Sequence, residues 1–231
     1  EALDVYYKPQ SIHEELCNRN LVTVMTDNIG LVYSHTESHD QALDHFQRAL
    51  AIFEELGNRA GQAQVIDHIG TVHFQQKNFQ EALDHYERAR TIYEELGDRA
   101  GVAVETGSIA NALVRLERYD EARPIVAAYN EMDVFDPRYR VGRCLLNARL
   151  LEIDGHIDDA VTKYRDALEI AKEHGLRLEM GNIHEALRDL AKKQNDFAAY
   201  IEHNEAFMKI TDEVRGREAT ERMAMQEAER K

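Results

Sequence analysis

The chain of 231 residues has no tryptophan, only three prolines and only two cysteines. Scarce proline together with abundant alanine, leucine, glutamate and arginine favours helices over sheets. Two cysteines, Cys17 and Cys144, cannot build a disulfide framework, so we expect packing thiols in a reducing, cytoplasmic compartment. No apolar run reaches the ~20 residues that a membrane-spanning helix needs, and we expect no membrane association.

Basic side chains are also in short supply. There are 28 of them against 43 acidic ones, which gives a formal net charge of −15. Nucleic-acid binding depends on basic side chains that neutralise phosphates, so we expect no nucleic-acid partner. An acidic surface is repelled by anionic membranes and favours basic or polar partners.

Catalytic motifs are missing from the sequence as well. It contains no nucleophile elbow, no phosphate-binding glycine loop, no dinucleotide motif and no zinc-protease motif. The adjacent acids Glu54 and Glu55 recur 40 residues later, which is typical of a solvated helix end. Among eleven histidines, His35 and His39 are four residues apart but flank a predicted turn, and three others share one repeat position: His45, His85 and His203. We therefore expect no enzyme activity, no catalytic residue, no cofactor and no metal site.

What the sequence does contain is an internal repeat. Residues 41–61 and 81–101 are identical at 14 of 21 positions, and residues 1–21 match residues 81–101 at ten. Unrelated segments of ordinary composition would share roughly one or two. One alanine marks the period along the chain, with a tyrosine in the last place: Ala2, Ala42, Ala82, Ala122, Ala160 and Tyr200.

Each unit of the repeat predicts two helices. In the second helix, Ala42, Phe46 and Ala49 share one face. The first helix carries a small residue that lets a neighbouring backbone approach closely: Gly30, Gly70, Ala110 or Ala148. Glycine takes the left-handed conformation that ends a helix, and an asparagine or aspartate then caps the next one; these residues are Gly57, Gly97 and Gly175, then Asn58 and Asp98.

These features resemble the tetratricopeptide repeat in its longer variant of about 40 residues. The resemblance is close over residues 1–125 and looser over 141–210, and similar repeats occur in kinesin light chains, spindle-orientation adaptors and bacterial signalling proteins. It implies an all-α, right-handed superhelix of antiparallel helix pairs. The implied units are 1–20 (the second helix of a truncated repeat), 21–60, 61–100, 101–140, 141–180 (degenerate) and 181–212, followed by an exit or capping helix over 213–231. Because the chain begins at Glu1 and not at Met, we expect a fragment of a longer protein.

The resemblance also implies where a partner binds. In such solenoids the first helices line an inner groove that holds a protein or peptide. The matching residues are Asp27, Asn28, Leu31, Asp67, His68, Thr71, Phe74, Ser108, Asn111 and Arg115. Asp27 and Asp67 stand where binders of chaperone tails carry lysines, so we expect a basic or polar ligand and not a C-terminal carboxylate.

The tail supports an alternative. From Phe197 onward only Gly216 interrupts the helix-forming residues, which predicts one helix to the end of the chain. Bacterial signalling proteins resemble this arrangement when repeats lead into an adenylate or guanylate cyclase or a histidine kinase. The second hypothesis is therefore a regulatory segment that transmits through this helix. A homodimer through the helix is a further hypothesis, although Arg217 and Glu221 interrupt its apolar seam.

Overall fold

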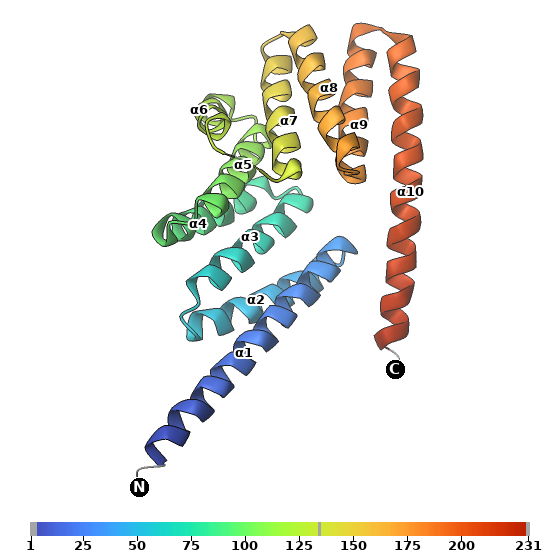
Figure 1. Cartoon of the computed structure of the whole chain (residues 1–231). Helices are drawn as coiled ribbons and strands as arrows, with labels where there is room; N and C mark the ends of the chain where they lie inside the picture. Colours follow the sequence, from blue (N-terminus) through green and yellow to red (C-terminus); the bar gives the residue numbers. More distant parts are fainter. Residues whose placement is uncertain (1–3, 134, 230–231) are drawn as a thin grey trace. The chain divides into compact units, whose positions relative to one another are not determined.

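The computed structural model describes the backbone of residues 4–133 and 135–229, and the side chains of residues 19–133 and 135–216. The chain divides into two compact units, Glu1–Glu117 and Arg118–Lys231. The first unit contains α1 (Asp4–His35), α2 (His39–Glu55), α3 (Arg59–Gln75), α4 (Phe79–Leu96) and α5 (Arg99–Arg115) (Figure 1). The second contains α6 (Tyr119–Asn130), α7 (Pro137–Ile153), α8 (Ile157–Glu173), α9 (Arg177–Gln194) and α10 (Phe197–Glu229).

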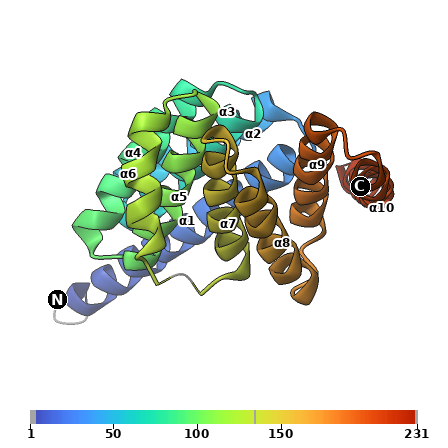
Figure 2. The same ribbon diagram turned by 90° about the horizontal axis from the view of Figure 1, so that it is seen from above.

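Within each unit, helices that follow one another in the chain pack together. In the first unit α1 packs on α2, α2 on α3, α3 on α4, and α4 on α5. In the second, α7, α8 and α9 lie side by side in both views (Figure 1, Figure 2), and α10 packs on α9. No strand occurs among the described residues. The predicted all-α fold of repeated helix pairs is confirmed.

The turns between pairs follow from the predicted glycines and caps. Gly57 and Gly97 have φ angles of +65° and +70°, in the left-handed region where a glycine has no side chain to clash. The next helix is capped each time, because Asn58 accepts a hydrogen bond from the amide of Gly61, and Asp98 accepts from the amides of Ala100 and Gly101. These predictions are confirmed.

The turns that join the two helices of a pair also contain a residue in the left-handed region, and most of these residues carry a side chain. Lys77, between α3 and α4, has a φ angle of +65°. Four such positions hold a residue other than glycine, namely Glu37, Lys77, Glu117 and Asn195, whereas Gly155 occupies the fifth. A side chain in the left-handed region costs free energy, so Lys77 strains this turn.

The core of the first unit is a layer of alanines and aromatic rings. A Cβ added to Gly30 would lie 2.6 Å from the ring of Phe46, and one added to Gly70 would lie 2.9 Å from the ring of Tyr86. The small residues are therefore closely covered, but by aromatic rings of the second helices and not by the neighbouring backbone that was predicted. The layer between α2 and α3 consists of Ala42, Phe46, Ala49, Phe53, Val65, Ile69 and Val72.

An ion pair recurs with the repeat. It joins an arginine to a glutamate 36 residues later; Arg59 and Arg177 lie at the starts of α3 and α9, and Glu55 and Glu95 lie near the ends of α2 and α4. The pairs are Arg19 with Glu55, Arg59 with Glu95, and Arg177 with Glu213. Exposed pairs of this kind contribute at most about 1 kcal/mol each. Because the pairs recur at equivalent positions, they show which residues of one repeat are equivalent to those of another.

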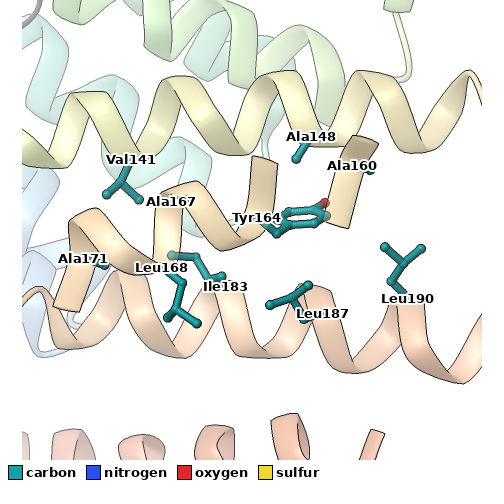
Figure 3. Packing of buried hydrophobic residues seen from close by; sticks show 10 residues of the cluster. All are labelled: Val141, Ala148, Ala160, Tyr164, Ala167, Leu168, Ala171, Ile183, Leu187 and Leu190. Carbon is teal, nitrogen blue, oxygen red and sulfur yellow. The ribbon is translucent and has the colours of Figure 1, made fainter. Parts of the chain in front are cut away.

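The second unit has a separate core between α7, α8 and α9 (Figure 3). Tyr164 of α8 lies between Ala148 of α7 and Leu187 of α9. Its hydroxyl donates to Glu152 over 3.2 Å, and Lys193 of α9 donates to the same carboxylate over 2.7 Å. The looser sequence match after residue 141 therefore still produces the same packing of three helices.

The structure differs from the expected units at two places. α1 runs from Asp4 to His35 without a break at residue 20, whereas the single helix predicted from Phe197 onward is present as α10 up to Glu229. The first difference has a clear cause, since Cys17 stands where Gly57 and Gly97 end the later second helices. The second is the division of the chain between residues 117 and 118, which separates α5 from α6 inside the expected unit 101–140.

Candidate functional site

All ten residues predicted to meet a ligand lie in the first unit, on α1, α3 and α5. We call the side of these helices that carries them the first-helix face. Asn28, Asn111 and Arg115 are exposed, whereas Asp27 is only 2% exposed. The remaining six are half-buried: Leu31, Asp67, His68, Thr71, Phe74 and Ser108.

Asp27 joins α1 to α3. Its Oδ1 lies 2.8 Å from Nδ1 of His68, and Gln64 donates from Nε2 to its Oδ2 over 3.4 Å. The ring of His68 in turn lies 5.3 Å from the ring of Phe46, measured between centroids. The carboxylate of Asp27 is thus engaged by its neighbours, and Asp27 is the least accessible of the ten residues.

Aromatic contacts connect the other end of the face. The rings of Phe74 and Phe79 meet edge to face with centroids 5.1 Å apart, and the guanidinium of Arg115 lies 5.1 Å above the ring of Phe79. Such a cation–π contact contributes about 0.5–1 kcal/mol at an exposed site. Thr71 is directed to the interior, with its hydroxyl 3.4 Å from that of Tyr86. Phe79 of α4 therefore brings Phe74 and Arg115 together.

Three carboxyl groups follow one another across this region, on α1, α3 and α5: Asp27, Asp67 and Glu105. Burial is the main cause that raises the pKa of Asp67; the charge of Asp27 raises it further, and His68 opposes both. Burial also raises the pKa of Glu105 to about 9, with a further contribution from Asp67 and an opposing one from Arg90. Negative charge is therefore unfavourable here.

Glu105 is the residue that the sequence interpretation missed. Its side chain is 1% exposed, and neither carboxyl oxygen has a hydrogen-bond partner among the described residues. The signal was present in the repeat, because position 105 follows position 65 by one period and Val65 is a core residue. A carboxyl at a core position of a repeat is out of place unless it is neutral or has a specific role.

An exposed apolar strip on α1 was also missed. Met25, Ile29 and Val32 are between 41% and 57% exposed. The residues one period later, Val65, Ile69 and Val72, are buried against α2. Side chains at these positions are therefore buried where another helix packs against them.

Two of the histidines that share a repeat position, His45 and His85, form ring pairs. His45 stacks on Tyr33 and His85 on His73, with centroids 5.4 Å apart in both pairs. No group of three or more metal-ligating side chains gathers anywhere in the part of the chain that the structure describes. Within the same part, no helix has both the length and the apolar character that crossing a membrane demands.

The profile of the tetratricopeptide repeat matches residues 21–95 and again residues 60–128. This chain is a tetratricopeptide-repeat protein. No curated protein matches its sequence.

Solved structures resemble this tetratricopeptide-repeat protein in fold. Aspartyl phosphate phosphatase F from Bacillus subtilis has a TM-score of 0.61 at 14% identity, over 85% of this chain and 60% of that one. BtubC (BKLC) from P. vanneervenii has a TM-score of 0.63 at 13% identity, over 93% and 89% of the two chains. A Rap protein complexed with competence and sporulation factor has a TM-score of 0.62 at 17% identity, over 93% and 57%. The chain thus spans less than two thirds of the phosphatase and of the Rap protein, and the likeness concerns the fold alone.

Proposed function

We propose that this tetratricopeptide-repeat protein is a protein-interaction module whose first-helix face binds a basic, polar segment of a partner protein. The observation that carries the proposal is Asp67, a half-buried carboxyl between two other carboxyls that accepts no hydrogen bond from a described residue. A positive charge brought by a ligand would favour its ionised form. The formal net charge of −15 attracts such a ligand over a longer range.

The exposed amides supply the polar part of the proposed contact. Asn28 and Asn111 lie on α1 and α5, on either side of the helix that carries Asp67. Asparagine amides both donate and accept hydrogen bonds, so they can pair with the backbone of an extended peptide, whose polar groups need partners once water is displaced. A ligand whose backbone pairs with the two asparagine amides and whose cation pairs with Asp67 is a polar, basic peptide.

The test compares variants that leave the fold intact. Asp67→Asn removes the charge at constant size, and Asn111→Ala removes an exposed amide. Glu87→Gln and Asn182→Ala are the matched controls, since both residues are exposed and lie off the first-helix face. Asp27 is kept, because its bond to His68 holds two helices together.

Binding is measured by fluorescence anisotropy with short labelled peptides of equal length that are basic, neutral or acidic. We expect the basic peptide to bind best, and Asp67→Asn and Asn111→Ala to weaken it while the two controls leave it unchanged. Equal binding by all five proteins would remove the first-helix face as the binding surface.

The length of α10 favours a second candidate function, a regulatory segment that transmits through its last helix. α10 has 33 residues against 18 in α9, so it extends about 20 Å farther than its packing partner (Figure 1). In this reading the projecting part pairs with a second copy or leads into another domain. Light scattering on the chain with and without residues 213–231 tests the dimer, and equal monomer masses would defeat it.

A further inference from the structure

The second unit contains a cleft that the first-helix face does not involve. It has a volume of about 450 Å³ and lies between the end of α8, the first half of α9 and the middle of α10. We call it the basic cleft. Its apolar lining comes from Met180, Ala206 and Ile210. Its charged lining comes from Lys172, Arg177 and Lys209 and from one carboxylate, Glu213.

The residues around the cleft differ from those at the same place in an earlier repeat. Arg59 pairs with Glu95 and Arg177 pairs with Glu213, so the two repeats can be aligned residue by residue. The residues of the earlier repeat that form a buried cluster there are Ala63, Ile66, Ala89 and Ile92.

In the later repeat, Gly181 replaces Ala63 and His184 replaces Ile66. The Nδ1 atom of His184 lies 3.2 Å from Nδ1 of His203, so its ring pairs with a histidine where Ile66 belongs to an apolar cluster. Ile210, the counterpart of the buried Ile92, is left half-buried. The residues around the cleft thus differ from the apolar cluster of the earlier repeat, and Phe207 stands where that cluster has Ala89.

The charges around the cleft have changed along with its shape. Lys172 stands where the earlier repeat has Glu54, and Lys209 stands where it has Thr91. Arg177 is paired with Glu213, and Lys172 with Glu169 over 3.0 Å in an exposed pair that is worth little. Lys209 makes no ion pair with any residue whose side chain the structure describes. A basic rim therefore surrounds an apolar floor in a chain whose net charge is strongly negative.

We infer that the basic cleft binds an acidic peptide segment that inserts one apolar side chain between flanking carboxylates. The three cations stand on three different helices, so the anions that match them must be separated, as they are along a peptide. An amphiphile with a single acidic head would match only one of them. Apolar burial supplies affinity and the rim charges supply selection for acidic sequences. The inference goes beyond the proposed function, because the site lies in the other unit and takes a ligand of opposite charge.

The test uses the full chain and a labelled peptide with one leucine between two pairs of acidic residues. Lys209→Glu reverses a rim charge, and Ala206→Phe fills the floor. Lys192→Glu is the matched control, since Lys192 is an exposed lysine in the last turn of α9 away from the cleft lining. Circular dichroism checks that each variant is folded.

We expect Lys209→Glu and Ala206→Phe each to weaken binding about tenfold, and Lys192→Glu to leave it unchanged. Replacing the leucine of the peptide by glycine should weaken binding to a similar extent. Asn111→Ala, on the first-helix face, should have no effect, so the two sites can fail independently.

Three results would overturn the inference. Equal loss in Lys192→Glu and Lys209→Glu would mean general attraction between charges. Equal binding of the leucine and glycine peptides would mean that the apolar floor is not used. Binding of decanoate without binding of the peptide would identify a small amphiphile as the occupant.

Discussion

Replacing Glu105 by glutamine should stabilise the first unit, and the gain should depend on pH. Burial raises the pKa of Glu105 to about 9 in the folded chain, whereas its ordinary value is 4.5. At neutral pH the folded state therefore holds a proton that the unfolded state has released. Each pKa unit corresponds to about 1.4 kcal/mol, so taking up that proton near pH 7 costs about 3 kcal/mol as an upper bound.

Glutamine has nearly the shape of a protonated glutamate and bears no such cost. We expect Glu105→Gln to raise the free energy of unfolding by about 1 to 3 kcal/mol near pH 7, the lower values allowing for the coupling with Asp67. The folded state binds more protons than the unfolded state between pH 4.5 and about 9, so the stability of the parent chain falls across that window as the pH rises. The advantage of the variant should therefore be near zero at the acidic end and largest at the alkaline end.

Urea unfolding followed by circular dichroism at several pH values measures this difference. Glu87→Gln makes the same replacement at an exposed position of α4 and should change little. A difference that does not vary with pH, or a variant less stable than the parent at alkaline pH, would show that Glu105 is ionised and has a partner in the folded chain.

Three further predictions concern stability. Burial and neighbouring charges lower the pKa of His85 to about 4 from 6.5, so the folded state binds fewer protons between these values. Acidification across that window should then cost about 1–2 kcal/mol after allowance for solvent screening, and urea titrations of the parent and of His85→Leu should show less acid sensitivity in the variant. Gly70→Ala should cost about 1–3 kcal/mol, because its Cβ would meet the ring of Tyr86, whereas Gly142→Ala, with open space around its Cβ, should be neutral or stabilising by thermal unfolding. Lys77→Gly should raise the unfolding free energy by about 0.5–1 kcal/mol in urea titrations, because it relieves a φ angle of +65°; a loss of stability would contradict that reasoning.

The repeat made much of the fold predictable, for reasons visible at single residues. Gly57 and Gly97 could be read as helix ends because few residues tolerate a left-handed backbone, and Asn58 and Asp98 could be read as caps because their short side chains reach the next amides. The other repeats predict a break near residue 20, whereas α1 continues because Cys17 replaces the glycine that ends their second helices.

The candidate site was less predictable because its state depends on contacts between repeats. Asp27 looked available for a ligand, yet His68, one repeat later, engages it. Glu105 is unusual only when it is compared with Val65, the residue one period earlier. The substitutions around the basic cleft stand out only when Arg177 is aligned with Arg59. The spacing of 40 residues becomes 38 before Ala160, and the ion pairs of Arg59 and Arg177 agree with the register that Ala42 and Ala160 give.

The segment Arg59-Ala60-Gly61 is repeated as Arg99-Ala100-Gly101, and the rings of Phe53 and Tyr93 cover the two glycines in the same way. A second copy of residues 59–98 inserted after Asp98 would therefore meet matching surfaces at both of its ends. Every such insertion would lengthen the row of first helices by one while both termini keep their present neighbours. Growth by whole segments thus offers this chain a direct way to set the length of its row of first helices.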